Sequence, residues 1–105
     1  MKLVEQGDVV LVPLAKLPPK SDLEILKKGR GIVVAEGEVT GHAHRVIGVA
    51  TLARNKATGD IILIPDEETT MEHDTHHSVP VEGPAIVEIV QERDHLTRET
   101  RKVRD

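Results

Sequence analysis

Residues 45–65, RVIGVATLARNKATGDIILIP, decide the fold class of this chain. Two runs rich in Val, Ile, Leu and Ala, RVIGVATLAR and DIILIP, flank the short polar segment NKATG. Aliphatic runs on both sides of a polar, glycine-containing turn are typical of a β-hairpin. The alternation within the first run predicts a single strand, one side of which is formed by Val46, Gly48, Ala50 and Leu52.

Further strands are expected on both sides of this hairpin. The segments predicted to be extended are residues 8–14, 31–36, 67–81 and 85–92. Between the first two, Ser21 and Glu24 fit a capping box, which predicts a helical turn over Asp22–Leu26. No long amphipathic helix pattern competes with the strands. The sequence therefore predicts an all-β fold, a small single-domain β-sandwich or barrel of six to eight short strands.

The chain has 105 residues, which is the size of one domain. We expect a β domain over residues 1–93 and a charged C-terminal tail or short helix over residues 94–105. Phe, Tyr and Trp are absent, so the core must be built from Val, Ile, Leu, Ala and two Met. A small core without aromatic rings predicts modest stability for the monomer, and a homo-oligomer is expected as a supplement.

Composition excludes several classes of function. A net charge of −4 and the absence of aromatic rings disfavour binding of nucleic acid. The absence of cysteine excludes disulfide scaffolds, cysteine zinc sites and thiol nucleophiles. The first 19 residues contain neither a signal peptide nor a membrane span, so a cytoplasmic location is expected, or a virion if the chain is phage-encoded. No nucleophile elbow or phosphate-binding glycine motif is present.

Five of the six histidines fall into two short clusters, in GHAHR and in MEHDTHH. On one strand, His42 and His44 would share a face about 6.6 Å apart, at ~3.3 Å per residue. In the second cluster, His73 and His77 would share one face and His76 the other. Three or four imidazoles suit a divalent transition metal, either Zn, Fe, Ni or Cu. The predicted metal ligands are His42, His44, His73 and His77, and the nearby carboxylates that could assist them are Glu38, Glu72 and Asp74.

Two other hypotheses stay open at this stage. The first is a metal-free oligomeric module for structure or interaction, such as a phage virion or accessory protein, with its histidines at an interface or on the surface. The second, ranked below both, is a metal-dependent enzyme that uses the same ion; no catalytic residue is assigned.

Several segments of the chain resemble a group of small bacterial and phage proteins of unknown function. These segments are QGDVVLVPLAKLP, AEGEVTGHAHRV, a later His before PVEG, VEIVQERD and RKVRD. The resemblance extends over most of the chain and is most specific in GEVTGHAHR. It implies that Gly41, His42 and His44 recur in the family, together with one of His76 or His77. An aromatic residue expected after the last strand is replaced by Asp94 or His95.

The order of an HxH pair followed by a later His is also similar to that of cupins, which hold one metal inside a jelly roll. A cupin carries a Glu a few residues after the pair, whereas RVIGVA follows here. The later His of a cupin comes after the PxG turn, whereas His77 precedes PVEG. The similarity therefore concerns the geometry of a site, and the fold prediction stays at a sandwich or barrel.

Overall fold

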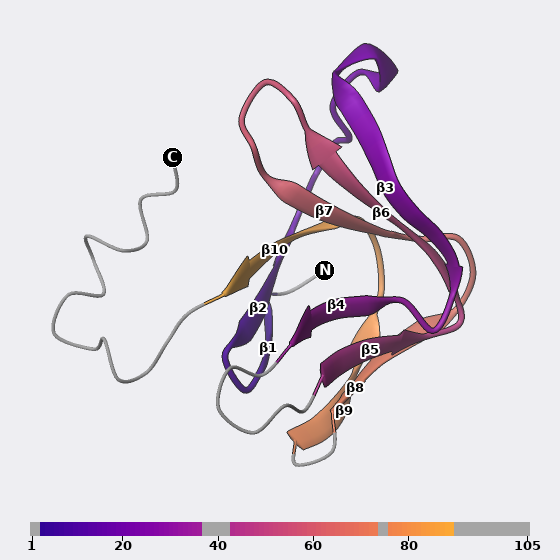
Figure 1. The fold of residues 1–105 in the computed structure, drawn as a ribbon. Coiled ribbons are helices and arrows are strands. Elements are labelled where there is room, and N and C mark those ends of the chain that lie inside the picture. The colour runs from indigo at the N-terminus through magenta and orange to yellow at the C-terminus, as the bar shows by residue number, and fades with distance from the viewer. Residues whose placement is uncertain (1–2, 37–42, 74–75, 90–105) are drawn as a thin grey trace, which may run out of the picture.

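The computed structural model describes residues 3–36, 43–73 and 76–89, which form two antiparallel β-sheets (Figure 1). The six-stranded sheet has the order β1-β2-β10-β7-β6-β3, and the four-stranded sheet has the order β4-β5-β8-β9. The first sheet contains β1 (Val4–Gln6), β2 (Val9–Pro13), β3 (Leu23–Arg30), β6 (Val49–Asn55), β7 (Ile61–Pro65) and β10 (Ala85–Ile89). The second contains β4 (Val33–Glu36), β5 (Ala43–Ile47), β8 (Thr69–His73) and β9 (His76–Val81). The all-β prediction is confirmed, and the described residues form ten strands in place of the six to eight predicted.

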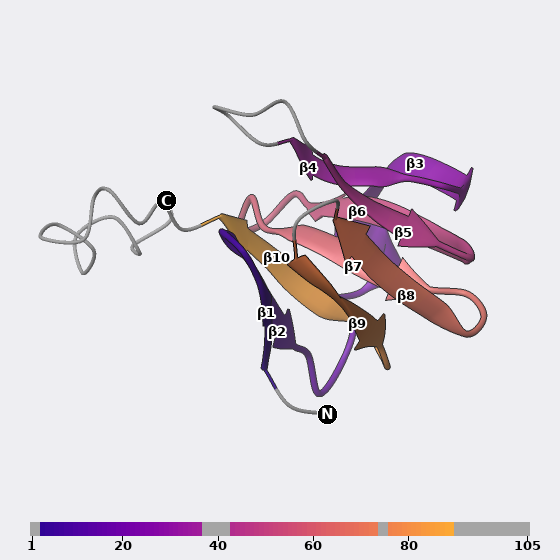
Figure 2. The same cartoon turned by 90° about the horizontal axis from the view of Figure 1, so that it is seen from below.

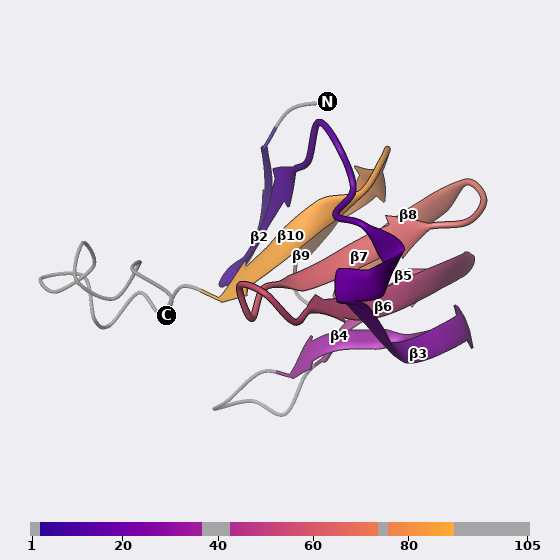
Figure 3. The ribbon, with the colours of Figure 1, turned by 90° about the horizontal axis from the view of Figure 1, so that it is seen from above.

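The two sheets enclose one aliphatic core. Figures 2 and 3 show the molecule from opposite sides, with the strands of the six-stranded sheet fanning from β2 to β3 in Figure 3. Alternate residues of both sheets point inward, as expected for packed sheets. The buried cluster consists of Val9, Leu11, Ile32, Val46, Ala50, Leu52, Leu63, Met71, Val81, Ala85 and Val87. Close packing of branched aliphatic side chains thus replaces the aromatic rings that the composition lacks.

The chain passes between the sheets at a shared corner. Arg30 pairs with Val49 in the six-stranded sheet, and Val33 pairs with Arg45 in the four-stranded sheet. Gly31 and Gly48 lie between these pairs with φ angles of 70° and 115°, a region that favours glycine. Figure 1 shows the two long ribbons β3–β4 and β5–β6 turning back at this corner.

This corner corrects the prediction of a single strand over residues 45–54. Gly48 divides that run into β5 and β6, which belong to different sheets. The regular alternation changes at the same point, because Ala50, Thr51, Leu52 and Ala53 are all buried. The second half of the predicted hairpin is confirmed, since β6 and β7 pair directly across Asn55–Asp60.

The predicted helical turn over Asp22–Leu26 is wrong. A three-residue 3₁₀ turn covers Lys20–Asp22, with no side-chain capping hydrogen bond, and Leu23–Arg30 is strand β3. The helix propensity of LEILKK is a local preference. It is overridden by the tertiary fold, in which seven residues of this strand pair with β6. The short strand β1 was likewise not expected.

The predicted extended segment 67–81 contains two strands, β8 and β9, paired antiparallel. Residues 8–14 and 85–92 contain β2 and β10 as predicted. The predicted tail over residues 94–105 lies outside the described residues. Within the described part of the chain, no helix has the length and apolar character needed to cross a membrane.

Candidate metal centre

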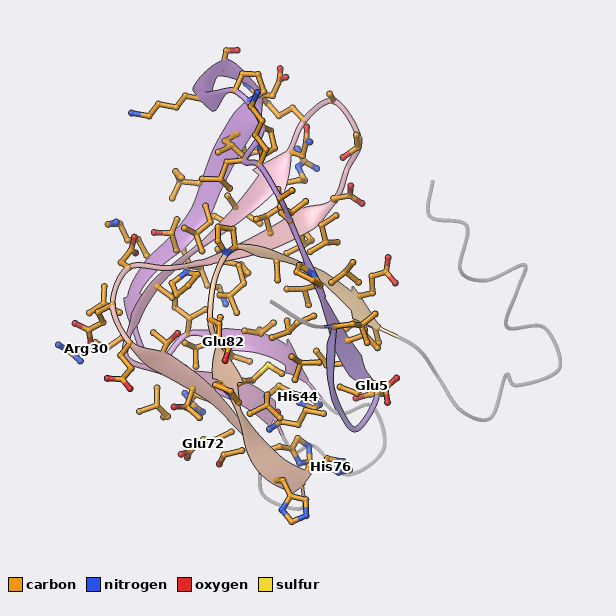
Figure 4. The ribbon with its side chains drawn as sticks, turned by 180° about the vertical axis from the view of Figure 1, so that it is seen from behind. Glu5, Arg30, His44, Glu72, His76 and Glu82 are labelled. Atoms are coloured by element: carbon orange, nitrogen blue, oxygen red, sulfur yellow. The ribbon has the colours of Figure 1, made fainter. Side chains whose placement is uncertain are left out.

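Three imidazoles from three neighbouring strands meet at one end of the four-stranded sheet. His44 lies on β5, His73 ends β8, and His76 begins β9. The ring centroids of His44 and His73 are 4.3 Å apart, those of His73 and His76 4.6 Å, and those of His44 and His76 6.3 Å. Figure 4 shows His44 and His76 together at the end of the molecule that carries the β1–β2 turn.

Strand periodicity explains why these rings converge. On β5, His44 and Val46 are buried, whereas Arg45 and Ile47 are exposed. On β8, Met71 is buried on the face opposite the exposed Glu72, and His73 follows Met71 at a spacing of two residues. Val46 pairs with Met71, and His73 pairs with His76. Side chains of directly paired residues point to the same face of a sheet, so the three rings become neighbours.

The predicted ligands are brought together only in part. His44 and His73 belong to this histidine cluster, whereas His42 lies outside the described residues. The prediction placed His77 on the face of His73, because it assumed one continuous strand through residues 73–77. The register shift between β8 and β9 instead pairs His73 with His76. The side chain of His77 is exposed.

The β1–β2 turn covers the histidine cluster. Gln6 pairs with Val9, so Gly7 and Asp8 form a two-residue hairpin loop. Gly7 has a φ of 60°, and no other residue type has a positive φ in the described chain, which defines a type II′ turn. A Cβ at Gly7 would lie 2.7 Å from Cδ2 of His76. Glycine is therefore required both by the turn and by the imidazole that packs on it.

Gln6 links the two sheets through its buried amide. Its Nε2 donates to the carbonyl oxygens of Met71, at 2.9 Å, and His77, at 2.6 Å. Its Oε1 lies 2.9 Å from Nδ1 of His44. Carbonyl oxygens only accept hydrogen bonds, so these contacts fix the orientation of the amide. The Oε1 of Gln6 must then accept from Nδ1–H of His44.

Asp8 approaches the other nitrogen of the same ring. Its Oδ1 lies 3.1 Å from Nε2 of His44, and the His44 side chain is 1% exposed. Burial lowers the pKa of His44 below its ordinary value of 6.5, the hydrogen bond with Asp8 opposes this, and the charges of His73 and His76 add to the lowering. A neutral ring carries one N–H, which Gln6 already takes. The contact with Asp8 therefore joins two acceptors unless a cation lies between them.

Sequence patterns gave no role to Gln6 or Asp8. The contacts of these two residues with His44 span 38 and 36 positions of the chain. The one signal was the QGDV segment of the family resemblance. Of the predicted assisting carboxylates, Glu72 is exposed, while Glu38 and Asp74 lie outside the described residues.

No group of three or more His, Asp or Glu side chains is already arranged to hold a metal ion among the residues that the structure describes. Two donors, Asp8 Oδ1 and His44 Nε2, are in ligand-like proximity. His73 is half-buried and His76 is exposed, and neither ring belongs to the buried aliphatic core.

The lowered pKa of His44 predicts that the metal-free protein loses stability as the pH falls below about 6.5. In this range the unfolded chain takes up a proton at residue 44, whereas the folded protein resists it until its own lower pKa is reached. The free energy of unfolding should therefore decrease with falling pH and level off below the folded pKa.

Urea unfolding followed by circular dichroism, at several pH values between about 7.5 and 5 with chelator present, measures this dependence. The variant His44→Gln should show a shallower dependence, because it removes the ring whose pKa is lowered by folding. An equally steep dependence in the variant would contradict the assignment to His44.

The described residues define a small all-β protein with a histidine cluster under a type II′ turn. A family model described as a domain of unknown function (DUF8820) matches residues 5–84. The chain therefore belongs to this family, in agreement with the resemblance to an uncharacterised group. The matched region contains Gln6, Asp8 and all three clustered histidines. No curated protein and no solved structure matches the chain.

Proposed function

We propose that this protein binds one divalent transition metal ion, either Zn, Fe, Ni or Cu, at the histidine cluster. The observation that carries the proposal is the meeting of His44, His73 and His76 from three different strands, with ring centroids 4.3–6.3 Å apart. His44 supplies one ligand, and His73 or His76 supplies at least one more. His42 remains a predicted ligand from the sequence.

The ring spacing suits a shared ion. An ion about 2.1 Å from a ligating nitrogen lies roughly 3.2 Å from the centroid of that ring. Two rings that bind the same ion therefore have centroids about 4.5 Å apart when the angle at the ion is about 90°, and about 6.4 Å apart when it is about 180°. The measured separations of 4.3, 4.6 and 6.3 Å are near these limits. Small rotations of His73 and His76 would bring their nitrogens toward a common point, which they do not yet share.

The fixed tautomer of His44 supports the same proposal. Metal-ligating histidines commonly donate their second ring N–H to a carbonyl or carboxylate oxygen, which orients the ring. Here Gln6 accepts from Nδ1 at 2.9 Å, and Nε2 is left with its lone pair. The amide of Gln6 is itself held by two carbonyl oxygens, so the ring is held in a defined orientation before any ion arrives.

Metal analysis of untagged protein, followed by calorimetric titration with Zn²⁺, tests the proposal. We expect about one equivalent in the wild type, and an affinity at least about tenfold lower in His44→Ala. His76→Ala should also weaken binding, whereas the matched variant His77→Ala, which removes an exposed ring and keeps its carbonyl, should not. Concentrations must come from peptide-bond absorbance, since the chain has no Trp or Tyr.

The proposal fails if none of the four metals binds the wild type after reconstitution. It also fails if His44→Ala retains the wild-type affinity. Equal losses in His76→Ala and His77→Ala would favour the sequence prediction, in which His77 is a ligand.

A metal-free oligomeric module is the second candidate, and the observation in its favour is the exposed aliphatic side chains of strand β3. This strand forms an edge of the six-stranded sheet and exposes Ile25 by 57% and Leu26 by 43%. The same strand carries Lys27, Lys28 and a bulge at Leu26, which are features that discourage pairing at an edge. An oligomeric module predicts stability that depends on protein concentration and is indifferent to chelator.

A further inference from the structure

The contact between Asp8 and His44 carries an inference about the composition of the site. Hydrogen bonding of Gln6 leaves Nε2 of His44 with a lone pair when the ring is neutral. An ionised carboxylate also offers only lone pairs. Yet Asp8 Oδ1 lies 3.1 Å from this nitrogen. Two acceptors at this distance need a proton or a metal ion between them.

The separation of these two atoms fits two ligands of one ion. Donors about 2.1 Å from an ion lie roughly 3.0 Å apart at an octahedral angle and roughly 3.4 Å apart at a tetrahedral angle. The observed 3.1 Å falls between these values. The Asp8 side chain is 32% exposed, so an ion at this position remains open to water on one side.

A proton is the competing occupant, in an ion pair between an imidazolium and Asp8. Such a pair requires His44 to carry a positive charge with its side chain 1% exposed and two further imidazoles within 6.3 Å. Removing a charge from water costs several kcal/mol unless its partners offset the cost. One carboxylate that is itself partly exposed is a weak partner for this purpose.

We propose that Asp8 Oδ1 is a ligand of the same metal ion as His44 Nε2, which makes the site a mixed one of one carboxylate and two histidines. This inference rests on the proposed metal binding and adds an oxygen ligand to it. Two imidazoles and a carboxylate suit the divalent ions Zn²⁺, Fe²⁺, Ni²⁺ and Cu²⁺, whereas monovalent Cu⁺ prefers sulfur ligands. Such a set also leaves coordination positions for water or a small anionic ligand.

The test compares Asp8→Asn with Glu5→Gln. Both variants remove one carboxylate charge from the β1–β2 hairpin, but Glu5 is exposed on the outer face of β1 (Figure 4). Asn has the shape of Asp, and its amide can donate to Nε2 of His44, so the metal-free variant should fold with at least the wild-type melting temperature. Zn²⁺ affinity is measured by calorimetry, and Co²⁺ at saturation reports the ligand set through its visible absorption bands.

We expect Asp8→Asn to bind Zn²⁺ at least about tenfold more weakly than the wild type and to shift the Co²⁺ bands, with Glu5→Gln unchanged in both. Wild-type Zn²⁺ affinity in Asp8→Asn would overturn the inference and leave the proposed function standing. Weaker binding with unshifted Co²⁺ bands would also overturn it, because Asp8 would then act through charge alone. If the wild type itself binds no Zn²⁺ or Co²⁺, the inference falls together with the proposed function.

Discussion

Gly48→Ala should lower the free energy of unfolding by about 3 kcal/mol, a large part of the 5–15 kcal/mol typical of a domain. Gly48 has a φ of 115°, which L side chains rarely adopt. A Cβ there would lie 2.8 Å from the carbonyl oxygen of Glu68 and 2.7 Å from Cγ2 of Thr69. The carbonyl group of Glu68 belongs to the backbone, so it cannot rotate away from the added carbon as a side chain can. Strain and overpacking, each worth about 1–3 kcal/mol, therefore act together.

Gly59→Ala is the matched control for this prediction. Gly59 also has a positive φ, 84°, but a Cβ there would meet nothing within 4 Å. Its substitution should cost only the conformational penalty, about 1 kcal/mol. Urea unfolding followed by circular dichroism measures both variants. Equal losses would show that the corner at Gly48 tolerates the added carbon, and would contradict the close packing of Gly48 against Glu68.

The fold class follows from the sequence because its strands carry strong local signals. Aliphatic runs bounded by glycine, proline and polar turns predicted β2, β7 and β10 within a few residues. The missed features depend on contacts across the chain. The segment LEILKKGR has no β-branched alternation and pairs as β3 because β6 offers its edge. Gly48 looks like an interior residue of one strand, since periodicity contains no information about which sheet each half joins.

The candidate site could likewise be predicted only where its signals were local in the sequence. Period-2 spacing and the clustering of histidines pointed to His44 and His73, and the structure brings these two rings within 4.3 Å. The choice between His76 and His77 depended on the register shift in the β8–β9 pair, which one strand's pattern cannot reveal. No local sequence pattern predicts a role for Gln6 and Asp8, because these residues contact His44 only after the two sheets have packed.

Gln6→Met should lower the free energy of unfolding by roughly 3–5 kcal/mol, because it removes three hydrogen bonds without changing the volume of the side chain much. Gln6 is 2% exposed. Its replacement leaves the carbonyl oxygens of Met71 and His77 and the Nδ1–H of His44 without this partner. Buried polar groups that lose a partner each cost about 1–3 kcal/mol. Urea unfolding of metal-free protein measures the loss.

Thr69→Val is the control for the loss of one weak buried hydrogen bond. Oγ1 of Thr69 donates to the carbonyl oxygen of Val81 at 3.4 Å, so its removal should cost about 1 kcal/mol or less. A loss in Gln6→Met no larger than in this control would mean that water or another group replaces the amide. The ¹⁵N chemical shifts of the His44 ring provide a second readout in the same variant. They should show the Nδ1–H tautomer in the wild type and a mixture of tautomers in Gln6→Met, because Gln6 is the contact that holds the proton on Nδ1 and leaves Nε2 available to a metal ion.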